Sequence, residues 1–125
     1  MLGDVDSAQV IYFASVFRWH EYNMSEWLAE RFTPLRHLLE SGHGLPVVSC
    51  SADYGKPILQ DDVLELESWV SGVSRSSFLF STNVLRDAVH MGTVTTRHVW
   101  TERDISGAFQ SKPLPEALQR ELNPL

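Results

Sequence analysis

Two carboxylates one residue apart, Asp4 and Asp6, stand ahead of a long apolar segment with helical spacing. A carboxylate in such a place can act as a nucleophile or as the general base for a water molecule. The free backbone N–H groups of a helix N-terminus can hold the oxyanion of an acyl-transfer reaction. The same carboxylates can instead cap turns or complement the helix dipole, and position alone favours this structural role.

Other catalytic patterns are missing. The sequence has no GxxxxGK[ST] phosphate loop, no GxSxG nucleophile motif and no HExxH pair. Its five histidines have no Cys-rich partner, so we expect no metal site. His20 lies on the apolar helix face and is expected to be a core residue with one hydrogen bond. The single cysteine, Cys50, is expected to be small and buried in a strand.

Length and charge exclude several classes of function. The 125 residues predict one domain, 1–125, and the net charge of −6 argues against nucleic-acid binding. No apolar run approaches the ~20 residues of a membrane span, and no basic, hydrophobic leader opens the sequence. We therefore expect a cytoplasmic protein that binds neither nucleic acid nor membrane.

One helix dominates the predicted elements. Its apolar residues recur at three- and four-residue steps and share a face: Phe13, Val16, Phe17, His20, Met24, Trp27 and Leu28. The β-favouring residues at 10–13 predict a helix start between Phe13 and Ser15. Because Pro34 disfavours helix at the residue before it, we expect the end near Phe32.

Strand patterns make up most of the remaining sequence. We expect strands at Pro46–Tyr54, Val63–Val73, Phe78–Arg86 and Met91–Thr101, with turns at 56–57, 60–62 and 87–88 and short helices at 34–40 and 115–122. One helix cannot cover both faces of such a sheet. We expect the uncovered face to carry Trp69, Leu79, Leu85 and Trp100 and to be buried between protomers.

Three segments resemble the 4-hydroxybenzoyl-CoA thioesterase family. They are GDVDSAQVIYFASVFRW at 3–19, PVVSCSADY at 46–54 and DDVLELE at 61–67, and the family pattern is roughly D-x-D-x-x-G-x-V-aromatic-aromatic. The resemblance runs from Gly3 to about Thr101. It implies an α+β hotdog fold, an antiparallel sheet wrapped around one long central helix. It also implies a side-by-side homodimer, often a homotetramer, with active sites between protomers.

The resemblance places three functional roles on this sequence. The catalytic carboxylate falls on Asp6, and the backbone N–H that polarises the thioester carbonyl falls on Phe13. The basic stretch that meets the phosphates of coenzyme A falls on residues 73–76, where only Arg75 is basic. The alternative for Arg75 is a solvated turn residue without a role.

The sequence departs from the family at two points. The first strand is shortened or missing, and Gln9 stands where the family has a glycine after the second aspartate. A glutamine there reshapes the turn, shortens the pocket or contacts the substrate. Tyr12 and Trp19 border the expected acyl site if they do not pack in the core, and ring stacking would then favour an aromatic acyl group.

The resemblance therefore implies an acyl-CoA thioesterase acting on an aromatic or compact hydrophobic acyl group. It needs no metal or redox cofactor, because coenzyme A arrives as part of the substrate. Two alternatives stay open. One is a non-catalytic acyl-CoA binding protein. The other is a hotdog dehydratase using His20 beside Glu21, although that pair lies far from the aspartate segment.

Overall fold

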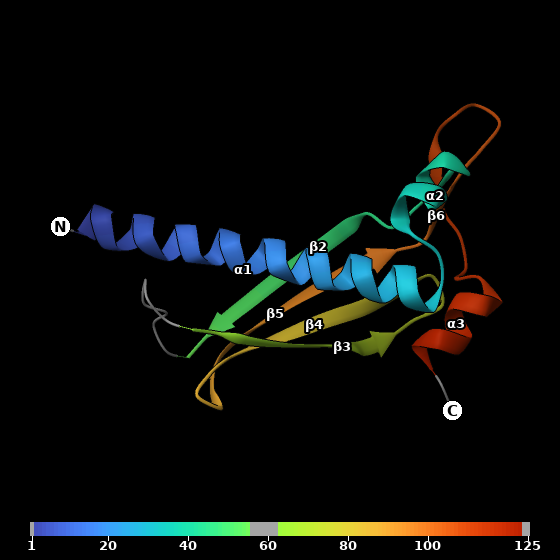
Figure 1. Cartoon of the computed structure of the whole chain (residues 1–125). Helices are drawn as coiled ribbons and strands as arrows, with labels where there is room; N and C mark the ends of the chain where they lie inside the picture. Colours follow the sequence, from blue (N-terminus) through green and yellow to red (C-terminus); the bar gives the residue numbers. More distant parts are fainter. Residues whose placement is uncertain (1, 56–62, 124–125) are drawn as a thin grey trace.

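One long helix lies along one face of a curved antiparallel sheet (Figure 1). The computed structural model describes the backbone of residues 2–55 and 63–123 and, apart from Tyr54, the side chains from residue 14 onward. The predicted turns at 56–57 and 60–62 lie outside the described residues. Within the described part, the α+β arrangement of a sheet around one helix is confirmed.

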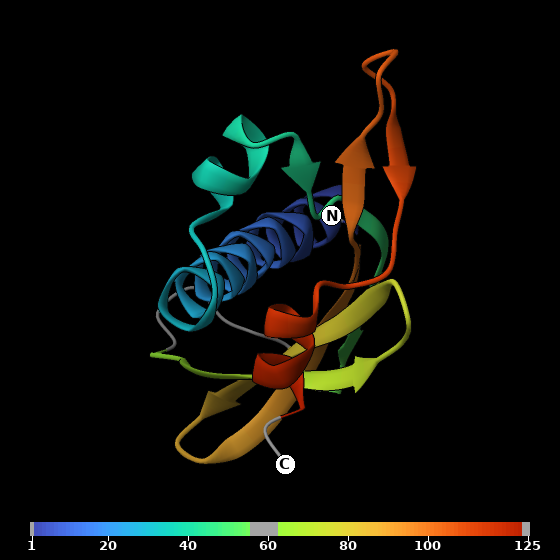
Figure 2. The ribbon, with the colours of Figure 1, turned by 90° about the vertical axis from the view of Figure 1, so that its right-hand side faces the viewer.

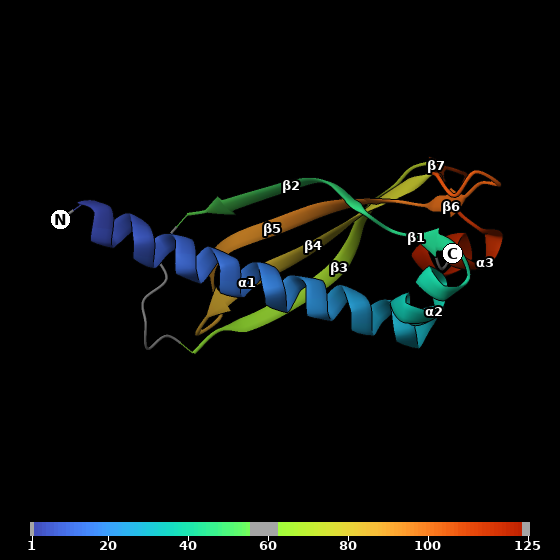
Figure 3. The same ribbon diagram turned by 90° about the horizontal axis from the view of Figure 1, so that it is seen from above.

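The central helix, α1 (Leu2–Arg31), begins earlier than the sequence predicts. The expected start between Phe13 and Ser15 is wrong. Helix propensities of β-branched residues differ from those of good helix formers by only tenths of a kcal/mol, and extending an existing helix is far easier than nucleating one. The first part of α1 therefore continues beyond the end of the sheet (Figure 3). The predicted end is confirmed, because the Phe32 N–H still donates to the Leu28 carbonyl.

The main sheet has four strands in the order β2-β5-β4-β3, all antiparallel. They are β2 (Val47–Tyr54), β3 (Glu65–Val73), β4 (Ser77–Arg86) and β5 (Val89–Val99). The β4–β5 turn places Asp87 and Ala88 at positive φ, 50° and 66°, as a two-residue hairpin turn requires. β2 and β3 are the outer strands. Cys50 is exposed rather than buried because β2 has no neighbour on its outer side in the described part.

A second, smaller sheet was not predicted. It consists of β1 (His43–Gly44), β6 (Thr101–Arg103) and β7 (Phe109–Ser111), in the order β1-β6-β7. The predicted strand Met91–Thr101 is broken at Trp100, where the chain passes from the main sheet into the small one. The β6–β7 hairpin projects away from the body of the molecule (Figure 2).

Two short helices flank the small sheet. They are α2 (Leu35–Glu40) and α3 (Glu116–Leu122), close to their predicted positions. Pro34 and Pro115 stand immediately before them as N-caps rather than within the first turn.

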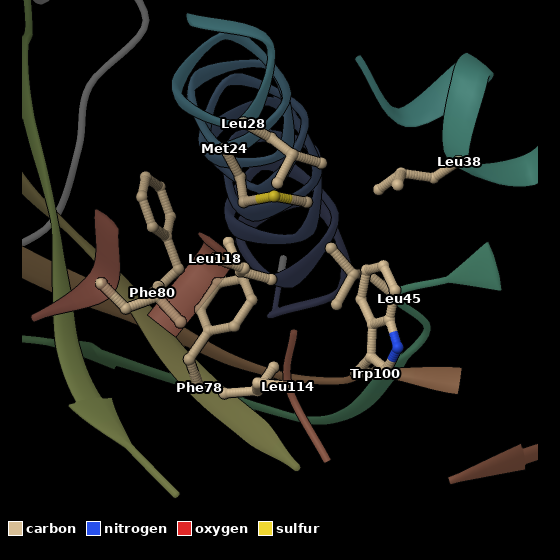
Figure 4. Close-up of a cluster of buried hydrophobic side chains, with 10 residues drawn as sticks. Met24, Leu28, Leu38, Leu45, Phe78, Phe80, Trp100, Leu114 and Leu118 are labelled. Atoms are coloured by element: carbon tan, nitrogen blue, oxygen red, sulfur yellow. The ribbon is translucent and has the colours of Figure 1, made fainter. Parts of the chain in front are cut away.

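Two apolar clusters fill the space between α1 and the sheet. The larger one lies beneath the second half of α1 (Figure 4) and contains Met24, Leu28, Leu38, Leu45, Phe78, Phe80, Trp100, Leu114, Leu118 and Leu122. The smaller one contains Val16, Val84, Met91 and Val94. Each buried apolar side chain contributes about 1.5–3 kcal/mol to stability relative to an exposed one. These two clusters, called the seam below, are the main apolar contact that the structure describes for α1.

The prediction for the opposite face of the sheet is partly wrong. Leu79 and Leu85 alternate with the buried residues of β4 and therefore face away from α1, as expected. Trp69 pairs in register with Ser81 on that same outer face and is 41% exposed. Trp100, however, is buried in the larger cluster. Side chains along a strand alternate between its two faces, so Trp100 lies on the same face as His98, two residues earlier. The sequence analysis overlooked this alternation.

Candidate functional site

The residues with predicted catalytic roles lie in the first part of α1. Asp4 and Asp6 fall in its first two turns, where carboxylates complement the helix dipole. Phe13 lies in the interior of α1 rather than at its N-terminus. The side chains of Asp6, Gln9, Tyr12 and Phe13 are outside the described residues, so their roles stay predictions.

Trp19 is the first predicted substrate contact whose side chain is described. It lies on the outer side of α1 and is 43% exposed, whereas its neighbour His20 is fully buried. Its ring is therefore not part of the core of this chain. Contact with an acyl group stays a prediction.

Arg75 occupies the turn between β3 and β4 and is exposed. The turn is held by its backbone: the Ser74 N–H donates to the Ser77 carbonyl at 2.8 Å, and the Leu114 N–H donates to the Arg75 carbonyl at 2.9 Å. These bonds use the backbone of the turn and involve no atom of the Arg75 side chain. The turn lies at the end of the sheet opposite to the N-terminus of α1 (Figure 1). One chain therefore does not bring Asp6 and Arg75 together.

A second arginine, missed by the sequence analysis, lies at the same turn. Arg97 of β5 donates from Nη1 to Ser77 Oγ at 2.8 Å and to Ser74 Oγ at 3.3 Å. Among the described residues, neither Arg75 nor Arg97 has an acidic group within 4.0 Å. Only the pairing of β4 with β5 brings Arg97 to this turn, and no local sequence signal shows that pairing.

His20 is a buried core residue, as predicted, but it makes two hydrogen bonds instead of one. Its Nδ1 lies 2.6 Å from Thr82 Oγ1, and its Nε2 lies 2.7 Å from Thr96 Oγ1. Burial, and then the neighbouring His98, lower the pKa of His20 to about 4. Glu21 is exposed, so the pair that a dehydratase would need is not formed.

An apolar pocket of about 460 Å³ lies near the opposite end of the molecule from the aspartates. It is lined by Leu35, Leu39, Gly44, Leu45, Pro46, Thr101 and Phe109, none of which is a predicted site residue. The described residues contain no group of three or more metal-ligating side chains. None of the described helices has the length and apolar character needed to cross a bilayer.

Comparison with known proteins identifies relatives that act on aromatic thioesters. The 1,4-dihydroxy-2-naphthoyl-CoA hydrolase of Prochlorococcus marinus (strain NATL1A) is 28% identical over 105 residues, covering 78% of this chain and 70% of the relative. The structure of a 1,4-dihydroxy-2-naphthoyl-CoA thioesterase from Synechocystis superposes with a TM-score of 0.77 at 23% identity, over 97% of this chain and 88% of that one.

A gentisyl-coenzyme A thioesterase has the same fold, with a TM-score of 0.73 at 18% identity, over 96% of this chain and 92% of that one. These structural matches confirm the expected hotdog fold. The family model described as the thioesterase-like superfamily matches residues 1–122, almost the whole chain. The protein therefore belongs to the thioesterase-like superfamily.

Proposed function

We propose that this protein hydrolyses coenzyme A thioesters with an aromatic or compact hydrophobic acyl group. The family match over residues 1–122, which includes the aspartate segment, carries the proposal. The names of relatives specify 1,4-dihydroxy-2-naphthoyl-CoA and gentisyl-coenzyme A, both aromatic thioesters. The reaction adds water across the C–S bond, so the products are a carboxylic acid and the free thiol of coenzyme A. A cytoplasmic location is part of the proposal.

Asp6 is the proposed catalytic carboxylate. As a nucleophile, it attacks the thioester carbonyl and expels the thiolate, and water then hydrolyses the acyl anhydride. As a general base, it takes a proton from the water that attacks the same carbon. Either route places negative charge on the carbonyl oxygen, which the Phe13 N–H is proposed to stabilise.

The proposed role of Phe13 requires a local rearrangement of α1. In a regular helix an interior N–H donates to the carbonyl four residues earlier. The segment before Phe13 must therefore leave the helix when substrate or a second protomer binds. Gln9 and Tyr12 belong to this segment and, with Trp19, are proposed to contact the acyl group.

The two arginines are proposed to bind the phosphates of coenzyme A. Arg97 keeps N–H donors beyond those bonded to Ser74 and Ser77, and Arg75 has no acidic partner among the described residues. Because this turn and Asp6 lie at opposite ends of one chain, the proposed site combines residues of two protomers. The open outer edge of β2 is the proposed contact for a homodimer, and a homotetramer is the larger alternative.

A non-catalytic acyl-CoA binding protein is the second candidate. The observation that favours it is the continuous helix through Gln9 and Phe13, because the Phe13 N–H is not free in that conformation. Such a protein would bind thioesters without hydrolysing them.

We expect the protein to hydrolyse benzoyl-CoA with a higher kcat/KM than decanoyl-CoA. Gln9 shortens the proposed pocket, and stacking on Tyr12 or Trp19 favours a flat group by ~1 kcal/mol. Release of the thiol, followed with a chromogenic thiol reagent, measures both rates. A preference for decanoyl-CoA would contradict the aromatic pocket, and binding of both thioesters without turnover would favour the second candidate.

We expect Asp6→Asn to lower kcat by about 100-fold or more, because the amide can neither attack the thioester nor accept a proton. Asp4→Asn is the matched control and should lose much less activity. The kcat values of both variants, measured on the best substrate from the screen, test the assignment. Wild-type turnover in Asp6→Asn would overturn it.

We expect Arg75→Ala to raise KM for an acyl-CoA about fivefold at low salt while changing kcat less. The lost attraction to phosphate, ~1 kcal/mol, is the same in the ground state and the transition state. Arg120→Ala is a suitable control, since Arg120 is exposed on α3 and, within the described part of the chain, its ion-pair partner is the exposed Glu116. An unchanged KM at low salt would make Arg75 a solvated turn residue.

We expect the protein to be at least a dimer at micromolar concentration in sedimentation. Cys50, the only cysteine, stands near the middle of β2, so two antiparallel β2 strands would place both thiols close to the two-fold axis. A short bis-maleimide should then cross-link the wild type. The control carries Ser71→Cys on β3 in a Cys50→Ser background and should not cross-link. A monomer in sedimentation would refute the shared site.

A further inference from the structure

A continuous chain of buried and part-buried hydrogen bonds joins α1 to the sheet between the two apolar clusters. In order of contact its members are Asn23, Ser68, Thr82, His20, Thr96, His98 and the Leu45 carbonyl. Successive donor–acceptor distances lie between 2.6 and 3.3 Å. We call this the His20–His98 chain. It links α1 to β3, β4 and β5 and then to the segment that enters β2.

The Leu45 carbonyl fixes the direction of the chain at one end. A carbonyl oxygen can only accept, so His98 Nδ1, at 3.3 Å, carries a hydrogen and donates it. A neutral imidazole has one N–H, which leaves His98 Nε2 as an acceptor. Thr96 Oγ1, at 2.7 Å, must therefore donate its hydroxyl hydrogen to His98.

The same argument fixes the remaining members. Because Thr96 has no second hydrogen, it accepts from His20 Nε2–H, and His20 Nδ1 then accepts from the Thr82 hydroxyl. Thr82 in turn accepts from Ser68. Ser68 accepts from the side-chain amide of Asn23, a group that donates through its nitrogen. All hydrogen bonds of the chain are thus donated in one direction, from Asn23 toward the Leu45 carbonyl. The tautomers of His20 and His98 are assigned from their hydrogen-bond partners.

A further proton has no acceptable place in this chain. The two unprotonated nitrogens, His20 Nδ1 and His98 Nε2, each already receive a threonine hydroxyl hydrogen. Protonation would set two hydrogens against each other and would bury a charge without a counter-ion. Thr82 could accept from a protonated His20 only if its own hydroxyl hydrogen turned away to another acceptor.

Among the residues whose side chains are described, the groups packed around the two rings give no compensating negative charge. Around His20, Phe80 and Thr82 of β4 and Ser68 of β3 are neutral, and β5 contributes His98. From β2 the nearest titratable group in register is the thiol of Cys50, opposite Thr96. His98 stacks on Phe78, with ring centroids 5.4 Å apart. Glu21, the next residue of α1, is exposed to solvent.

We propose that the His20–His98 chain is a pH-sensitive contact that holds α1 on the sheet at neutral pH and releases it in acid. Its stabilisation is complete above the ordinary histidine pKa of 6.5 and is lost as the pH falls toward about 4, the pKa of buried His20. Burial lowers the pKa of His98 as well. The open state binds the additional protons, so acid favours opening.

The size of the effect follows from proton linkage. For each histidine, the equilibrium constant for opening rises up to tenfold per pH unit below 6.5. His20 alone would raise it roughly 15-fold between pH 6.5 and 5, because an exposed histidine is already half protonated at pH 6.5. Release would move α1, which carries the proposed catalytic segment, but the proposal does not depend on thioesterase activity.

Hydrogen exchange of the full-length protein tests the release. After correction for intrinsic exchange rates, we expect the opening constant of peptides within residues 15–28 to rise roughly 15-fold from pH 6.5 to 5 through His20 alone, and more if His98 titrates with it. His90→Gln is the control, since His90 is exposed and, among the described side chains, bonds to the neighbouring Thr93, and it should keep this dependence. His20→Gln should reduce it to the contribution of His98, and His98→Gln serves the same purpose if His20→Gln does not fold.

Nitrogen-detected NMR of the wild-type histidines tests the direction of the chain without any substitution. We expect His98 to carry its hydrogen on Nδ1 and His20 on Nε2 at pH 7. The opposite tautomers, or equal opening at pH 6.5 and 5, would overturn the proposal. A His20→Gln variant with the wild-type pH dependence would also overturn it.

Discussion

The burial of one narrow face of α1 against the sheet is the contact on which the rest of the structure depends. The face repeats every four residues, at Val16, His20, Met24 and Leu28, and each of these side chains is at most 4% exposed. Three of the four are apolar and one is polar. A shift of α1 by one turn would press His20 into an apolar cluster and leave Thr82 and Thr96 without partners. The one polar residue of this face, His20, therefore fixes the position of α1 along the sheet.

Because α1 covers only one face of the sheet, the opposite face and both outer strands are left open. On the outer face, neighbouring hydroxyls bond across the strands, with Ser81 Oγ 2.7 Å from both Ser71 Oγ and Thr95 Oγ1. These bonds satisfy the hydroxyl groups of the outer face. Trp69, on the same face, is partly exposed. An open strand edge exposes backbone groups that another chain can pair with. The fold is thus suited to association at its edges.

The elements with strong periodicity were predictable from the sequence, and the contacts that join distant residues were not. The spacing of Met24 and Leu28 predicts the helix face, and alternation predicts the strands. The helix start was missed because the β-favouring propensities of residues 10–13 are too weak to stop a helix that has already nucleated from extending through them. Thr82 and Thr96 look like ordinary strand residues in sequence. Their partner His20 lies 62 and 76 residues away, so only the fold brings them together. The same holds for Arg97 beside Ser74, 23 residues away.

The position of α1 also explains why the proposed reaction involves the association of two chains. The N-terminal end of α1, where Asp6 lies in the first two turns, extends past the sheet (Figure 3). The arginines at the β3–β4 turn lie at the other end, beyond the larger apolar cluster. No rearrangement that keeps the seam intact can bring these ends together within one chain. In the proposed function, a substrate that contacts both Asp6 and these arginines would therefore bind between chains, with the seam setting the geometry that each chain contributes.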